Sequence, residues 1–289
     1  MTLTNTSNLL SRKVGRITES IDSIRPLPMS VSRVLVILEE PTATATAVAN
    51  LLGLDQALSA NVLLAANSAF LGFGPSCTTL KEAVMRLGFS RIRTLVLGVA
   101  AAGTMNTSLS GYRLAAGDLY NHAVATAVAA QWFARALSYP KPEEAYITGL
   151  LHDMGKITLD KFARQDYFLM VDHLREKKLP TWQIEQNVFG IDHAEIGYLM
   201  AKKWTFPELL SDAIQNHHSP AKSSSSHELS AIINIANYYS PVDETTLRKL
   251  GKRSLAAEAA SILNISESRL EELNNQMVAY FKINFSGRV

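Results

Sequence analysis

The apolar residues of this chain recur at intervals of three and four positions along nearly its whole length. That spacing is the period of an amphipathic α-helix, whereas a half-buried strand alternates apolar and polar residues strictly. We find no convincing strand alternation. Because a helical apolar stripe must be buried against other elements, the pattern predicts an all-α fold built from packed helices.

One polar stretch, Met105–Gly111, is rich in Asn, Thr, Ser and Gly and divides the helical pattern into two groups. Such composition between periodic segments is typical of a linker. We therefore expect a first helical lobe over residues 24–104, preceded by a helical extension over 1–23. A second lobe is expected over 112–240, and further helices over 241–289.

Helix boundaries are indicated by residues that commonly start or stop helices. Asp55, Thr79 and Ser90 are suitable N-caps, and Gly88 is suited to end a helix. The expected helices cover residues 30–40, 42–54, 56–67, 80–87, 91–102, 114–137, 143–152, 162–177, 181–188, 193–204, 207–217 and 228–239, with two or three more between 245 and 281.

Charge and cysteine usage narrow the classes of partner and compartment. The net charge is only +2 and no basic block occurs, so the sequence does not favour nucleic-acid binding. Cys77 is the single cysteine, which excludes an intramolecular disulfide and favours the reducing cytoplasm. Apolar stretches such as Leu95–Ala102 are shorter than the roughly 20 residues that span a bilayer, so we expect no membrane association.

Histidines and acids gather in the expected second lobe. Five of the seven histidines are candidates to meet there: His122, His152, His193, His217 and His218. Asp153 directly follows His152, and Asp118 lies one helical turn before His122. Imidazole nitrogen and carboxylate oxygen together suit Fe, Mn, Zn or a similar divalent ion. The sequence therefore predicts a metal site of unknown metal identity.

Two sets of motifs carry a family resemblance. Residues His152–Lys156 read His-Asp-Met-Gly-Lys, which resembles the signature of HD-domain metal-dependent phosphohydrolases. The first lobe is similar to that of HDOD proteins, on the motifs Leu27-Pro28, Ala66-Asn67-Ser68-Ala69 and Ala83–Gly88. The resemblance covers roughly Ile24–Ser240. It implies a two-lobed helical HDOD module with an HD-like helical core, used in bacterial signal transduction.

The resemblance also implies roles for individual residues. The catalytic HD-GYP relatives hydrolyse cyclic dinucleotides, and their ligand order matches His122, His152, Asp153, His193 and one or both of His217 and His218. Lys156 matches the lysine of their pattern, and Asp118 lies where they place an additional Glu. In an enzyme of this kind, Asp153 and Lys156 would be the catalytic residues.

The chain departs from the HD-GYP pattern at two places. Ser219-Pro220-Ala221-Lys222 follows the last histidine pair, where those relatives have Gly-Tyr-Pro. Asn237 stands at the closing Asp position, and a neutral amide oxygen is a weaker metal ligand than a carboxylate. Both departures favour regulation over catalysis.

The candidate residues also have structural interpretations. His152 could be a histidine at a helix end, and Asp153 a satisfied carboxylate. His122 and His193 could be buried histidines that bond to the backbone, and Asp192 could cap a helix. The carboxylate of Asp118 could stabilise the N-terminal end of its own helix, and the ammonium of Lys156 could stabilise the C-terminal end of the preceding helix. We interpret Asn67-Ser68 as a helix stop that packs between the lobes.

Two functions therefore remain open. The first is a regulatory module whose metal site stabilises a conformation or senses a nucleotide or phosphate, while the first lobe meets a signalling partner. The second is a phosphohydrolase, in which the ion activates water and Lys156 neutralises charge that develops on a phosphodiester.

Overall fold

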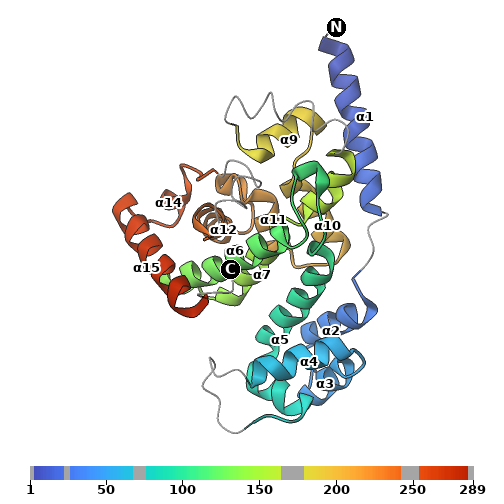
Figure 1. Cartoon of the computed structure of the whole chain (residues 1–289), viewed down its shortest axis with the longest axis vertical. Coiled ribbons are helices and arrows are strands. Elements are labelled where there is room, and N and C mark those ends of the chain that lie inside the picture. Colours follow the sequence, from blue (N-terminus) through green and yellow to red (C-terminus); the bar gives the residue numbers. More distant parts are fainter. Residues whose placement is uncertain (1–2, 23–26, 68–75, 164–178, 242–253, 286–289) are drawn as a thin grey trace. The chain divides into compact units, whose positions relative to one another are not determined.

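The computed structural model describes residues 3–22, 27–67, 76–163, 179–241 and 254–285 (Figure 1). These residues form helices joined by turns and contain no strand. An isolated antiparallel bridge joins Leu109 and Leu114 in a connecting segment. The predicted all-α fold is therefore confirmed over the described residues.

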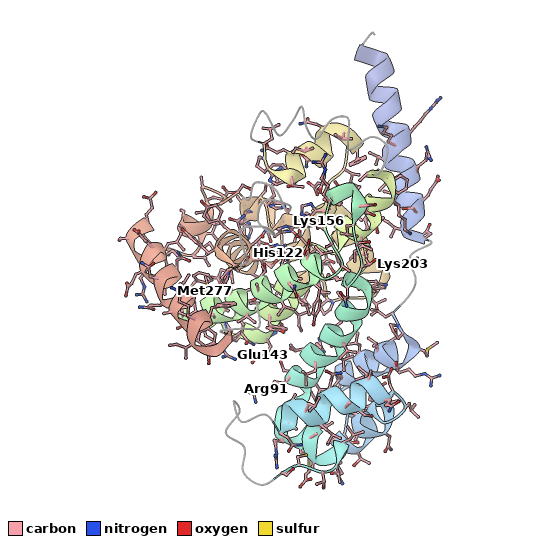
Figure 2. The ribbon with its side chains drawn as sticks, in the orientation of Figure 1. Arg91, His122, Glu143, Lys156, Lys203 and Met277 are labelled. Carbon is pink, nitrogen blue, oxygen red and sulfur yellow. The ribbon has the colours of Figure 1, made fainter. Side chains whose placement is uncertain are left out.

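The chain divides into two compact units. The small unit is residues 25–104, and the large unit is residues 1–24 together with 105–289. The N-terminal segment is thus part of the large unit, where α1 (Leu3–Asp22) contacts α9 (Thr181–Phe189) and α10 (His193–Lys203). Lys203 fixes the end of α1, because its ammonium donates to the carbonyls of Ile21 and Asp22 at 2.8 and 2.7 Å (Figure 2).

The small unit contains α2 (Met29–Glu39), α3 (Ala45–Leu52), α4 (Gln56–Ala66) and nearly all of α5 (Leu80–Met105). Asp55 caps α4 as predicted, since its carboxylate accepts from the amides of Ala57 and Leu58. The same carboxylate accepts from the Ser30 hydroxyl at 2.6 Å, which ties α2 to the start of α4.

The predicted stop at Gly88 takes the form of a kink. Its φ of 75° and ψ of 162° interrupt the helical backbone, yet helical structure resumes at once, so two expected helices form the single element α5. The core of the small unit is apolar: its buried side chains include Val31, Val34, Leu38, Val48, Leu52, Leu58, Val62, Val84, Leu87, Ile92 and Val96.

Further helices of the large unit include η2 (Ser110–Tyr112), α6 (Asp118–Ala136), α7 (Pro142–Leu151), α11 (Glu208–Asn216), η3 (Pro220–Lys222), α12 (His227–Tyr239), α14 (Ala259–Ile262) and α15 (Glu267–Phe285). The helices α6 and α7 approach closely, because a Cβ at Gly149 would lie only 2.9 Å from the Cα of Ala127. Around this pair, α12 packs on α6 and α11 packs on α10 (Figure 1).

Two expected helices differ from the structure at their ends. The helix expected from residue 114 begins at Asp118, because Gly117 adopts a φ of 91° and breaks the helical backbone before it. Residues 155–163 are helical, but most of the helix expected over 162–177 lies outside the described residues, as do 245–253. None of the described helices combines the length and apolar character needed to cross a membrane.

Candidate metal centre

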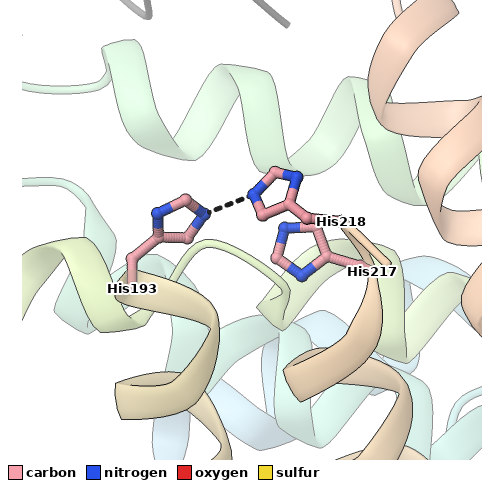
Figure 3. A group of neighbouring side chains, drawn as sticks. All are labelled: His193, His217 and His218. Atoms are coloured by element: carbon pink, nitrogen blue, oxygen red, sulfur yellow. Dashed lines mark hydrogen bonds between the residues drawn. The ribbon is translucent and has the colours of Figure 1, made fainter. Parts of the chain in front are cut away.

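The structure brings together six of the predicted site residues within the large unit. Their ligand atoms form two groups, and within each group all ligand atoms lie within 4.8 Å of one another. The first group is His122, His152 and Asp153, and the second is His193, His217 and His218. Figure 3 shows the second group, in which His193 and His218 approach through their ring nitrogens and the His217 ring lies beside that of His218. These groups could hold a metal ion.

Asp153 links the two groups. Its Oδ2 lies 3.4 Å from Nε2 of His122, and its Oδ1 lies 3.5 Å from Nε2 of His152. Oδ1 also lies 3.0 Å from Nε2 of His193, which belongs to the other group. One carboxylate therefore touches histidines from α6, from the end of α7 and from the start of α10.

The protonation of two histidines follows from their backbone partners. Nδ1 of His152 lies 2.7 Å from the Gly149 carbonyl, and Nδ1 of His217 lies 2.7 Å from the Ile214 carbonyl. A carbonyl oxygen only accepts, so each Nδ1 carries the proton and each neutral ring keeps its lone pair on Nε2. Burial is the main cause that lowers the pKa of both His152 and His217, so both rings are neutral near pH 7.

The Nε2 atoms of these two rings fit a metal ion. Both are buried without a hydrogen-bond partner. Buried polar atoms are normally satisfied, so two unpartnered acceptors beside the ionised carboxylate of Asp153 favour a cation that binds them. Imidazole nitrogen and carboxylate oxygen are the donor types that Fe, Mn and Zn accept.

His193 differs from the other histidines because it bonds to an acid. Its Nδ1 donates to Oε2 of Glu185 at 2.6 Å, and its backbone amide donates to the same oxygen at 2.8 Å. Burial alone would lower the pKa of His193, but the carboxylates of Glu185 and Asp153 raise it to about 9. His193 is therefore the one imidazole of its group that carries two protons in the absence of metal.

His218 completes the second group. Its Nε2 lies 3.0 Å from Nε2 of His193. Burial and the neighbouring rings of His217 and His193 hold the pKa of His218 well below its usual range, so His193 is the donor in this contact. A divalent ion held here would replace the His193 proton. On its other side, the His218 ring stacks on Trp182, with an interplanar angle of 18°.

Lys156 forms a buried ion pair with Asp153. Its Nζ lies 2.6 Å from Oδ2, and the residue is 5% exposed. Burial alone would raise the pKa of Asp153, but His152, Lys156 and His193 together hold it well below its usual range. Asp153 is therefore ionised, and one of its oxygens already has a cation beside it.

The sequence-predicted residue Asp118 lies outside the two ligand groups, and the role of Asn237 as a ligand stays a prediction. The Asp118 carboxylate accepts from the Ala115 amide at 2.8 Å, at the start of α6. Asn237 is buried on α12 with 8% of its surface exposed. One turn earlier on α12, Asn234 donates to the His217 carbonyl at 2.8 Å, so this helix holds the backbone of His217 in position.

Close helix packing positions His193. A Cβ at Gly155 would lie 2.0 Å from the His193 carbonyl oxygen and 2.8 Å from the amide of Gly197. Glycine at position 155 therefore lets the start of α10 come close enough for His193 to reach Asp153. At the same helix start, Asp192 caps α10, since its carboxylate accepts from the Glu195 amide at 2.9 Å.

The sequence of the chain matches the HDOD domain family over residues 24–220. This chain belongs to the HDOD family. Membership confirms the resemblance drawn from the Leu-Pro, Ala-Asn-Ser-Ala and His-Asp motifs, and the helical units are the HDOD fold.

Solved structures of similar proteins share this helical fold. A crystal structure of an HDOD domain protein from Geobacter sulfurreducens is 25% identical, covers 94% of each chain and superposes with a TM-score of 0.67. A crystal structure named "Putative phosphohydrolase" from Shewanella amazonensis is also 25% identical, covers 91% of this chain and 93% of its own, and has a TM-score of 0.68.

A longer relative matches in sequence. An uncharacterized protein of Treponema pallidum is 26% identical over 210 residues, which are 72% of this chain and 40% of the relative. The chain thus spans less than half the length of that curated relative.

Sequence reasoning missed three residues that support the HDOD site: Trp182, Glu185 and Asn234. Glu185 left a signal, because it lies in the apolar stripe of α9 between Ile184 and Val188, and a carboxylate in such a stripe needs a buried partner. The partners of Trp182 and Asn234 depend on tertiary contacts that helical spacing does not encode.

Proposed function

We propose that this HDOD protein is a signal-transduction module of the bacterial type, in which a divalent ion held by the His–Asp cluster fixes the conformation of the large unit. The observation that carries the proposal is the burial of the cluster. His152 and His217 are 0% exposed, and Asp153 and His193 are 1% exposed. Structural metal sites have all their coordination positions filled by protein atoms, which six buried or partly buried ligand side chains can do, whereas catalytic sites keep one position open to water and substrate.

The charges of the site support one ion better than two. Asp153 and Glu185 supply two negative charges, and Lys156 supplies one positive charge at Oδ2 of Asp153. One divalent ion would leave a small net charge, but a second would add two further positive charges with no carboxylate at Asn237 to balance them. Weak or absent hydrolysis is the expected consequence, because one ion cannot clamp both the attacking and the leaving oxygen.

The small unit is proposed to meet a signalling protein. Seven large apolar side chains are exposed among the described residues, and five of them belong to the small unit: Met29, Val36, Leu54, Leu64 and Met85. We propose that a signalling protein covers some of these side chains. With the single cysteine Cys77 free and buried, we place this module in the reducing cytoplasm.

A phosphohydrolase is the second candidate. It is favoured by the ammonium of Lys156 beside Asp153, and by the 25% identity to the Shewanella amazonensis protein. A bound divalent ion supplies an activated water in such enzymes. Asp153 would hold the ion, and Lys156 would bind a phosphate oxygen of a nucleotide or cyclic dinucleotide and neutralise the developing charge.

One experiment separates the two candidates. The protein, reconstituted with Mn²⁺, is assayed on cyclic dinucleotides and on bis(4-nitrophenyl) phosphate, and its thermal unfolding is recorded with and without chelator. The regulatory proposal expects a higher Tm with metal and hydrolysis close to background. Clear turnover that disappears in Lys156→Met, but persists in the exposed control Lys202→Met, would establish the enzyme instead.

A further inference from the structure

We propose that Tyr112, Glu185 and His193 form a hydrogen-bonded relay that couples metal binding at His193 to the segment joining the two units. The inference rests on the proposed metal site and adds a regulatory route to it. Tyr112 and Glu185 are positioning residues in this relay, since neither touches the position of the ion.

Two hydrogen bonds connect the three residues of the relay. The Tyr112 hydroxyl donates to Oε1 of Glu185 at 2.7 Å, and Oε2 accepts from Nδ1 of His193 at 2.6 Å. The exposed fractions of the three residues are 3%, 0% and 1%. Hydrogen bonds to a carboxylate in such a dry environment are strong, and losing a donor there is costly.

His193 differs from His152 and His217 in the group that accepts the hydrogen bond from its Nδ1–H. Those two rings donate Nδ1–H to backbone carbonyls, which are neutral acceptors fixed by their own helices. The acceptor of His193 is instead a side-chain carboxylate on a different helix, α9, so the position of Glu185 determines how the His193 ring is oriented. A carboxylate behind a metal-binding histidine typically contributes about 10- to 100-fold to metal affinity.

Tyr112 belongs to the segment through which the chain leaves the small unit. That unit ends at Thr104, and the backbone of Leu109 and Leu114 then closes a turn through two hydrogen bonds of 3.0 Å. Two buried carboxylates bind this turn. Asp160 accepts from the Gly111 amide at 2.7 Å, and Glu185 accepts from Tyr112.

The Glu185 attachment leads to the cluster, because Glu185 also bonds to His193. If the turn detaches, Glu185 loses a donor and His193 loses a fixed partner. Coupling between two binding events is reciprocal, so metal binding must in turn stabilise the attached turn. A signal that arrives at the small unit could therefore reach the metal site through Tyr112.

The test uses Co²⁺ as probe, because its visible absorption reports both affinity and ligand geometry without any assay of activity. Glu185→Gln keeps the shape of the side chain and one acceptor oxygen but removes the charge. Tyr112→Phe removes only the hydroxyl. The matched controls are Glu195→Gln, an exposed acid on α10, and Tyr198→Phe on the same helix.

We expect Glu185→Gln to weaken Co²⁺ binding by about 10- to 100-fold and to change the absorption spectrum. Tyr112→Phe should weaken binding several-fold in the parent protein and have no further effect in the Glu185→Gln background. Both controls should bind as the parent does. In hydrogen exchange, Co²⁺ should increase the protection of the amides at 109–114 in the parent but not in Tyr112→Phe.

Two results would overturn the relay. If the parent binds Co²⁺ and Glu185→Gln binds it equally well, or if the two substitutions act additively, the relay is wrong and the metal site stands. If the parent itself binds no Co²⁺, the proposed function fails and the relay fails with it. Should Glu185→Gln not fold, the exchange data on Tyr112→Phe decide alone.

Discussion

Oδ1 of Asp153 lies 3.0 Å from Nε2 of His193, although the two residues belong to different helical segments of the large unit. Gly155 makes this contact possible, because the start of α10 packs directly against its Cα. The glycine of the His-Asp-Met-Gly-Lys motif thus contributes to the metal site by allowing close helix packing, and it binds no ion itself.

We predict that Gly155→Ala abolishes metal binding and lowers the free energy of unfolding by at least about 2 kcal/mol. The added Cβ would lie 2.0 Å from the His193 carbonyl, and neither backbone can yield without moving the ligand. Thermal unfolding and metal titration measure the two effects. The control is Gly15→Ala, where no atom lies within 4 Å of the new Cβ. Unchanged metal binding by Gly155→Ala would show that α10 can shift without loss.

Asn67 is predicted to stabilise the small unit. Its side-chain amide donates to the Cys77 carbonyl at 2.9 Å and its Oδ1 accepts from the Cys77 amide at 2.7 Å. Asn67→Ala removes both bonds and should lower the unfolding free energy by about 1–2 kcal/mol in urea denaturation. Asn61→Ala, which loses only one exposed bond to the Ala57 carbonyl, is the control and should have little effect. Equal losses in both variants would contradict this role.

Asp212 gives a prediction of pH dependence. Burial alone would raise its pKa, but hydrogen bonds from Ser223 and from the amides of Ser225 and Ser224 lower it below the usual value. A depressed folded pKa contributes stability above the unfolded pKa of about 4, and that stability is lost as the pH falls through the folded pKa.

Asp212→Asn should therefore lower the unfolding free energy by about 1–3 kcal/mol at pH 7, and the difference from the parent should shrink as the pH falls below about 4. Urea denaturation across this pH range measures it. The control is Glu208→Gln, a half-exposed acid on the same helix that pairs with Lys202 instead of with serines. A difference that stays constant with pH would mean that the carboxylate charge is not what the serines stabilise.

Substitution of Asn237 tests whether the metal site can bind a second ion. A carboxylate at this position of α12 would supply the charge that a bridged pair of ions needs, so Asn237→Asp should raise metal content and any phosphodiesterase rate together. Elemental analysis and a cyclic-dinucleotide assay measure the two. Added metal without activity would favour a binding module. No change in either would show that Asn237 is not a ligand position.

Much of the architecture follows from local sequence. Asp55 and Asp192 cap the helices that follow them, and Gly88 breaks α5, because capping and left-handed backbone depend on single residues. The same local reasoning placed the start of α6 too early, since Ala115 and Gly117 continue the apolar and small-residue pattern without continuing the helix.

The supporting contacts of the site could not be predicted in this way. Tyr112 and Glu185 are 73 residues apart in sequence, and their bond exists only because η2 and α9 meet in the folded unit. Likewise, His152 and His217 each donate Nδ1–H to a backbone carbonyl three residues earlier. The consequence is that each Nε2 is left without a hydrogen-bond partner and can bind an ion together with ligands from other helices, which helical spacing does not reveal.

The most direct test of the account is the metal content of the protein, purified without chelator or affinity metal and then exposed to Fe²⁺, Mn²⁺ or Zn²⁺ before removal of the excess. We predict close to one ion per chain for the parent and for the exposed control His227→Ala. The double variant His152→Ala, Asp153→Ala should retain almost none and should no longer be stabilised by metal. A parent protein that retains none of the three metals, or a double variant that retains as much as the parent, would contradict the account.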